Sequence, residues 1–105
     1  MSAPKNSPAL MAVLERVAAE RIRQKQLLRD GKILFNCDSP VVDENRKLRI
    51  LMEEVGEVAE AMDRVECSKN SRAKLFAQED LETELVQVAA VVFAWLETYQ
   101  HEARP

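Results

Sequence analysis

The sequence has 105 residues, the length of one small domain, and carries a formal net charge of −3. Only two glycines and 5% aromatic residues argue against a β fold, whereas long runs of Ala, Leu, Glu, Lys and Arg favour helices. Basic and acidic residues are interspersed, so we expect no nucleic-acid partner. No apolar run approaches the roughly 20 residues that a membrane helix needs, so we expect no membrane partner. We predict one all-α domain over residues 1–105.

The charges are unevenly distributed along the chain. Residues 1–49 contain ten Lys and Arg against six Asp and Glu, while residues 50–105 contain five against twelve. Two interpretations remain open at this point. Either these are ordinary solvated helix faces, or the acidic half binds a metal ion and the basic half binds phosphates bridged to it.

The ends and the cysteines indicate the compartment. The first residues lack the apolar core of a secretion signal, so we expect residues 1–7 to be a flexible N-terminus of a cytoplasmic protein. Cys37 and Cys67 are far apart and have no second pair of zinc ligands nearby. We expect both to be free thiols, as is usual in a reducing compartment.

A first helix is predicted from Pro8 to Arg29, with Ser7 as its N-cap and Gly31 after its end. Its apolar row, formed by Leu10, Leu14 and Val17, continues geometrically into Arg21 and Gln24. An unpaired charge near the core is costly. We therefore expect Arg21 to pair with a buried glutamate of the second helix. The alternative is that Arg21, Gln24 or Lys25 contacts a triphosphate or a base.

The segment 31–42 contains turn formers around a short apolar patch at 33–35, which we expect to fill the core. A second helix is then predicted from near Asp43 to about Glu66. Its apolar residues recur at three-and-four spacing and predict a core-facing stripe of Leu48, Leu51, Val55, Val58, Met62 and Val65. Gly56 in its middle lowers helix propensity, and we expect it to permit close packing of a neighbouring helix.

Three glutamates of this second helix are candidates for chemistry. Glu54 and Glu57 lie in the row beside the apolar stripe and are neighbours on the helix surface, about 5–6 Å apart at Cβ. Two carboxylates held this closely repel each other, and partial burial adds a desolvation cost. A divalent cation relieves both penalties, and oxygen ligands suit Mg²⁺ or Mn²⁺. Glu53 is adjacent and is a candidate for orienting a water molecule.

A third helix is predicted to begin between Arg72 and Phe76, after a cap at Asn70 or Ser71. Glu84 and Gln87 repeat the three-residue spacing of the second helix and precede the apolar block 88–96. A helix that is apolar all round is buried. Three helices cannot bury such an element by themselves, so we expect a bundle completed by homodimerisation.

The order Glu53-Glu54-Val-Gly-Glu57, a spacer, then Glu84-Leu-Val-Gln87 resembles the MazG-like all-α nucleoside triphosphate pyrophosphohydrolases. The resemblance implies a MazG-like helical bundle that assembles as a homodimer or a dimer of dimers. It also implies that Glu54, Glu57, Glu84 and the residue at position 87 bind Mg²⁺. Gln87 departs from the family pattern, which has an aspartate there.

Two functions follow as hypotheses. The first is Mg²⁺-dependent hydrolysis of a nucleoside triphosphate to the monophosphate and pyrophosphate, for example in clearing unwanted nucleotides, with Glu53 orienting the attacking water. The second is a catalytically weak or inactive nucleotide-binding or dimerisation module, which the uncharged Gln87 favours. The sequence does not identify the preferred base or sugar.

Overall fold

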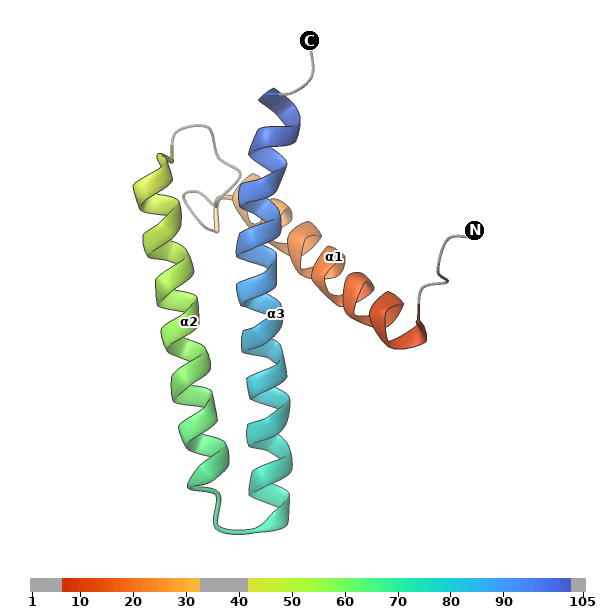
Figure 1. Cartoon of the computed structure of the whole chain (residues 1–105), viewed down its shortest axis with the longest axis vertical. Coiled ribbons are helices and arrows are strands. Elements are labelled where there is room, and N and C mark those ends of the chain that lie inside the picture. The colour runs from red at the N-terminus through yellow and green to blue at the C-terminus, as the bar shows by residue number, and fades with distance from the viewer. Residues whose placement is uncertain (1–6, 33–41, 103–105) are drawn as a thin grey trace, which may run out of the picture.

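The computed structural model describes residues 7–32 and 42–102, and within these ranges all regular structure is helical. The helices are α1 (Pro8–Arg29), α2 (Glu44–Glu66) and α3 (Ser71–Glu102). α2 and α3 lie side by side as an antiparallel hairpin, and α1 crosses α3 obliquely (Figure 1). α1 packs on α3 and not on α2. The expected all-α class is confirmed.

The helix ends follow from the residues that cap them. The side-chain oxygens of Ser7, Asp43 and Asn70 each accept a hydrogen bond from the backbone N–H three residues later, at 2.8–3.0 Å. Pro8 occupies the start of α1, where its missing N–H costs nothing. Gly31 follows the end of α1 with φ of 70°, a left-handed conformation that favours glycine. These local signals placed the helices within a residue or two of their predicted bounds.

The face of α2 that packs on α3 differs from the predicted apolar stripe. Leu48, Val55 and Met62, which we expected in the core, are exposed. The buried and half-buried residues of this face are Lys47, Ile50, Leu51, Glu54, Val58, Ala61 and Val65. Ala61 is completely buried, because its small side chain lets α3 approach closely along this row. The prediction was wrong for half of the stripe. The buried face is rotated around the helix relative to the prediction, and it includes Glu54.

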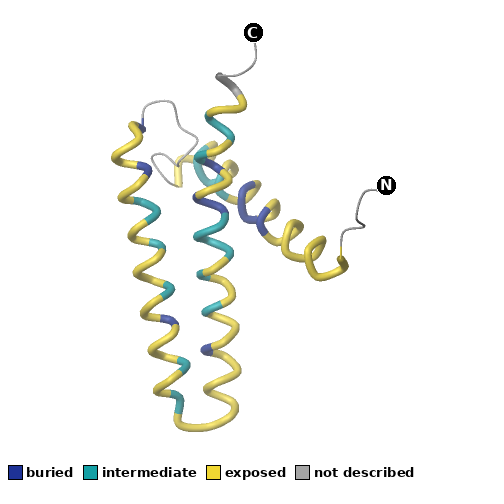
Figure 2. The backbone as a smooth tube through the Cα atoms, in the orientation of Figure 1, coloured by how far each residue is buried: buried dark blue, intermediate teal, exposed yellow. Residues whose placement is uncertain are grey.

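The core of the hairpin is narrow and consists largely of alanines (Figure 2). Its fully buried members on the last two helices are Ala61, Ala77, Ala90, Val91 and Ala94. Val91 and Ala94 pack against partly buried apolar residues of α2. In the apolar block 88–96, however, Val92, Phe93 and Leu96 are exposed. Within the single chain the block is therefore not buried on all sides, because α1 and α2 cover α3 on two sides only.

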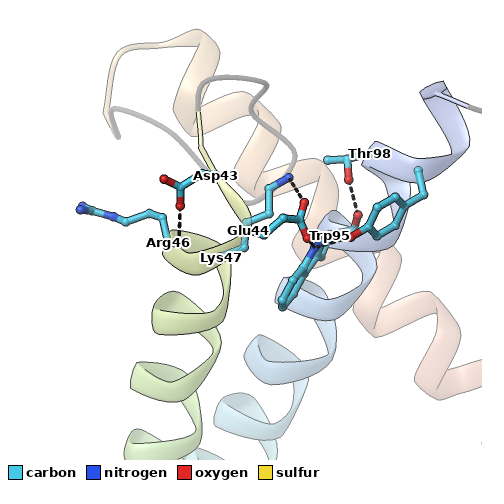
Figure 3. A network of polar contacts seen from close by, with 7 residues as sticks. Asp43, Glu44, Arg46, Lys47, Trp95 and Thr98 are labelled. Atoms are coloured by element: carbon cyan, nitrogen blue, oxygen red, sulfur yellow. Dashed lines mark hydrogen bonds and ion pairs between the residues drawn. The ribbon is translucent and has the colours of Figure 1, made fainter.

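Polar contacts tie the start of α2 to the last turns of α3 (Figure 3). Trp95 donates a hydrogen bond from Nε1 to Glu44 Oε2 at 2.8 Å, and the Tyr99 hydroxyl donates to the same oxygen at 2.6 Å. These hydrogen bonds hold the pKa of Glu44 below its usual range. Lys47 Nζ lies 3.8 Å from the other carboxylate oxygen. The contacts fix the open end of the hairpin, opposite the short connection between the two helices.

Some expectations fall on residues outside the described ranges, namely the N-terminal residues 1–6, the apolar patch 33–35 and Cys37. Cys67 is described, and it is exposed and free as expected. None of the described helices is both long enough and apolar enough to cross a membrane.

The buried alanine of α2 provides a test of the close helix contact. Ala61→Leu forces a larger side chain between α2 and α3, and we expect it to lower the free energy of unfolding by about 1–3 kcal/mol. Ala12→Leu, at an exposed position of α1, is the matched control and should change stability by a few tenths of a kcal/mol (about 0.5 at most). Urea denaturation of both variants measures the difference. Equal effects would contradict the close packing of α2 on α3.

Candidate metal centre

Three carboxylates from two helices meet across the hairpin. α2 contributes Glu54 and Glu57 from successive turns, and α3 contributes Glu84. One oxygen from each of the three side chains lies within 4.8 Å of the others. Because α2 and α3 are antiparallel, the acidic pair of α2 comes opposite the start of the apolar block of α3. The sequence predicted all three residues, and the structure brings them together.

Two oxygens in this cluster are buried without a hydrogen-bond donor from the described residues. They are Oε2 of Glu54 and Oε2 of Glu84. A buried carboxylate oxygen without a donor loses its hydration and receives nothing in exchange. Native proteins rarely leave such groups unsatisfied, and a bound ion or water commonly satisfies them. These oxygens therefore point to a ligand of positive charge between the helices.

Burial and mutual repulsion raise the pKa values of Glu54 and Glu84. Burial raises the pKa of Glu54 to about 7, with further contributions from the neighbouring charges of Glu57, Glu84 and Glu53. Burial also raises the pKa of Glu84, together with its contact with Glu57. In both groups the surroundings disfavour the charged form, and a bound cation would compensate for this.

The donor set fits a small divalent cation. Mg²⁺ is bound by oxygens at about 2.0–2.1 Å, which places neighbouring ligand oxygens roughly 3 Å apart and opposite ones roughly 4 Å apart. The separations of up to 4.8 Å within the cluster need only small side-chain adjustments to reach this geometry. Three carboxylates without nitrogen or sulfur ligands suit Mg²⁺ or Mn²⁺ better than zinc or copper.

Gln87, the fourth residue predicted to bind the metal, lies on the side of α3 that faces α1. It lines a pocket of about 290 Å³ between α1 and α3. Its amide lies close enough to Glu20 to help lower the pKa of that carboxyl group. Burial raises the pKa of Glu20, but hydrogen bonds from Arg23, Gln87 and Gln24 outweigh it and hold the pKa below the usual value. An acid at position 87 would face this second carboxylate, which gives a physical reason for an amide here.

Glu53, the predicted catalytic residue, is exposed beside the cluster. Its charge contributes to the raised pKa of Glu54, so the two groups are within electrostatic reach of each other. It does not belong to the group of three converging oxygens. Glu53 instead borders a shallow hollow together with Leu48, Arg49 and Met52. Its position leaves it accessible to solvent, as a group that orients water requires.

The predicted substrate-binding residues of α1 contact a part of α3 that is distant from the carboxylate cluster. The Arg21 side chain is only 5% exposed and forms an ion pair with Glu97. Lys25 lies 3.6 Å from the same carboxylate, and Gln24 accepts a hydrogen bond from Arg21 at 2.7 Å. Glu97 follows Glu84 by thirteen residues, roughly 20 Å along the helix. The expected pairing of Arg21 with the second helix was wrong, because α1 packs on α3 alone.

Sequence reasoning missed two residues near the centre. Glu20 is 9% exposed and binds Arg23 through both carboxylate oxygens, at 2.6–3.0 Å. Its position three residues after buried Val17 was a signal, because that spacing places a carboxylate beside the core-facing row. Arg64 also acts on the cluster, since its charge lowers the pKa of Glu84 against the effect of burial. The signal in the sequence was that Arg64 follows Glu57 by seven residues, which places the two side chains on the same face of α2.

Comparisons with known proteins give no assignment. No protein-family model matches the chain, and no match is found among curated proteins or among solved structures. The resemblance to MazG-like enzymes consequently stays a prediction from the two motifs.

The raised pKa of Glu54 predicts how the metal-free protein responds to pH. Between about pH 4.5 and pH 7 the unfolded chain releases the Glu54 proton while the folded chain keeps it. Folding stability in EDTA should therefore be greatest at acidic pH within this window and fall as pH rises. Glu54→Gln removes this penalty and should stabilise the metal-free protein at pH 8, by on the order of 1–2 kcal/mol.

Urea denaturation between pH 4.5 and 8 measures this effect. Glu60→Gln, an exposed glutamate of the same helix, should leave the pH dependence unchanged. Adding Mg²⁺ should reverse the order, because the wild-type protein then gains more from binding. A Glu54→Gln variant with wild-type pH dependence in EDTA would show that the carboxylate is not in a desolvated cluster.

Proposed function

We propose that this protein is a Mg²⁺-dependent nucleoside triphosphate pyrophosphohydrolase. The observation that supports the proposal is the cluster of Glu54, Glu57 and Glu84, with two buried oxygens that lack any donor. The order and spacing of these acids also resemble those of MazG-like enzymes. Three carboxylates give a ligand charge of −3, enough to hold a divalent cation and leave it attractive to a polyphosphate.

In the proposed reaction, water attacks the phosphoanhydride between the α and β phosphates. A new P–O bond forms, the bridging P–O bond breaks, and pyrophosphate leaves as the monophosphate is produced. A bound Mg²⁺ neutralises phosphate charge and makes the attacking water more acidic. Glu53, exposed beside the cluster, orients the water and accepts its proton. Glu54 and Glu84, half-buried between packed helices, and the exposed Glu57 beside them contribute by holding their charges in place, where little reorganisation is needed.

A second candidate is a nucleotide-binding module without chemistry. One observation favours it: Gln87, the uncharged residue at the position of the fourth predicted ligand, lines the pocket toward α1 and lowers the pKa of Glu20 there. The two candidates share the metal site and differ in turnover. They are separated by measuring both binding and product release.

Pyrophosphate release from a panel of ribo- and deoxyribonucleoside triphosphates tests the enzyme proposal. We expect release that depends on Mg²⁺ or Mn²⁺ with at least one substrate. Glu57→Gln removes one ligand charge and should reduce the rate roughly 100-fold, the loss typical of one electrostatic contact to the transition state. Glu60→Gln on the same helix serves as the control with wild-type activity.

A thermal-shift measurement with Mg²⁺ separates the candidates. Both predict that Mg²⁺ raises the Tm of the wild-type protein and raises that of Glu57→Gln much less. A metal-dependent shift without pyrophosphate release from any triphosphate would leave the binding module as the function. An equal shift in the two proteins would contradict both.

We also propose that two copies of the chain associate through what we call the open apolar face. Its residues are 36–58% exposed in the single chain and recur at three, four or seven residues on the hairpin: Leu48, Met52, Val55 and Met62 on α2, and Leu85, Val92, Leu96 and Tyr99 on α3. Such spacing forms one continuous stripe along each helix. An unpartnered apolar surface of this extent is typical of an interface.

The dimensions of the chain support the same proposal. Its radius of gyration is 16.4 Å, against about 13 Å for a compact domain of this length. Its accessible surface is 8128 Å², roughly 2,000 Å² more than a compact monomer of this mass exposes. Burial of this excess matches what each subunit of a stable homodimer typically loses, about 1,000–2,500 Å². A second copy of the chain offers the same stripe and is therefore the partner that fits.

A charge placed in the open apolar face tests the assembly. We expect Val92→Glu to yield a folded monomer, because this position is partly exposed within the chain but would be buried between copies. Gln26→Glu adds the same charge on the exposed surface of α1, outside this face, and should leave the dimer intact. Light scattering at micromolar concentration measures the mass, and circular dichroism measures helix content. A monomeric wild-type protein would contradict the proposal.

A further inference from the structure

Arg64 lies on the same face of α2 as the metal-binding glutamates. It follows Glu57 by seven residues, which is about 10 Å and nearly two full turns along the helix. Side chains of an α-helix lean toward its N-terminus. The long side chain of Arg64 is therefore carried back toward Glu57 and the carboxylate cluster.

The electrostatics of Glu84 agree with this position of Arg64. The charge of the guanidinium lowers the pKa of Glu84, the carboxylate that α3 contributes, and the charge of Asp80 raises it. Arg64 therefore lies on the Glu57 side of α2 and within electrostatic reach of the cluster. Its side chain is exposed, so a ligand can approach it from solvent.

Arg64 differs in its partners from three arginines of α1. Arg16, Arg21 and Arg23 form ion pairs with Glu82, Glu97 and Glu20, respectively. Within residues 7–32 and 42–102, Arg64 makes no side-chain hydrogen bond and no ion pair. The guanidinium donors near the cluster are therefore available to a ligand.

A cation in this position opposes metal binding, because it repels a divalent ion attracted to the same carboxylates. It is favourable for a ligand that brings negative charge to the metal. A guanidinium matches phosphate through two parallel hydrogen bonds. We infer that Arg64 binds the phosphate chain of the triphosphate held at the cluster of Glu54, Glu57 and Glu84, an inference that rests on the proposed function.

The competing explanation is that Arg64 only screens the repulsion among the acids. The two explanations predict different changes when the charge is removed. If Arg64 only screens, its loss strengthens the attraction of the cluster for Mg²⁺ and has no separate effect on phosphate. If Arg64 binds phosphate, its loss weakens the binding of a polyphosphate even when the affinity for Mg²⁺ is unchanged or higher.

Isothermal titration calorimetry with two probes distinguishes them. The probes are Mg²⁺ alone, and inorganic tripolyphosphate in saturating Mg²⁺, which has a phosphate chain without a base or sugar. For Arg64→Gln we expect the affinity for tripolyphosphate to fall at least about tenfold, as for loss of a charged hydrogen-bonded contact. The affinity for Mg²⁺ alone should stay the same or rise. Arg64→Lys, which keeps the charge but not the paired donors, should fall in between.

The control is Arg72→Gln, an exposed arginine of α3 that precedes Glu84 by twelve residues, about 18 Å along the helix. It should bind both probes like the wild-type protein. Melting temperatures without ligand report folding, and Arg64→Lys provides the test if Arg64→Gln does not fold. Wild-type affinity for tripolyphosphate in the Arg64 variants would overturn the inference. An effect seen with a nucleotide but not with tripolyphosphate would also overturn it, since Arg64 would then contact the base or sugar.

Failure of this inference is distinguishable from failure of the proposed function. A wild-type protein that binds Mg²⁺ and releases pyrophosphate, with Arg64 variants that bind tripolyphosphate normally, refutes the role of Arg64 alone. A wild-type protein that binds neither Mg²⁺ nor tripolyphosphate refutes both.

Discussion

The packing of α2 on α3 places three like charges between two helices, and the rest of the structure depends on this contact. Ala61, Ala77 and Ala90 let helix backbones approach closely. This approach half-buries Glu54 and Glu84 and leaves one buried oxygen of each without a hydrogen-bond partner in the part of the chain that the structure describes. Helix caps stabilise the hairpin against this energetic penalty. The hydrogen bonds from Trp95 and Tyr99 to Glu44 at the open end of the hairpin do the same. A cation bound by these carboxylates would relieve their repulsion and desolvation.

The position of α1 explains the amide at position 87. α1 packs on α3 alone and brings the buried carboxylate of Glu20 to the side of α3 where Gln87 lies. An aspartate at position 87 would add a second negative charge there, whereas the amide adds none. Arg21 and Lys25 of α1 form ion pairs with Glu97 of α3. These basic residues therefore stabilise the contact between α1 and α3.

The open apolar face and the metal centre are on opposite sides of α2. Leu48 and Glu57 are nine residues apart, which at about 100° per residue places them on opposite faces of the helix. A second copy packed on the open apolar face would therefore leave the carboxylates accessible. It would also cover the large apolar side chains that the narrow alanine core cannot enclose. Stability and site access are thus compatible in the proposed dimer.

The sequence by itself determined the three helices and the three clustered glutamates. Capping residues are local signals, and three-residue spacing brings two acids together on any helix. The tertiary structure alone decided which row of α2 meets α3, that Arg21 pairs with Glu97, and that Gln87 turns to Glu20. The physical reason is that helical periodicity fixes how side chains are arranged around one helix. Which side is buried depends on where small residues of two helices allow close approach, and that is settled only when the helices pack.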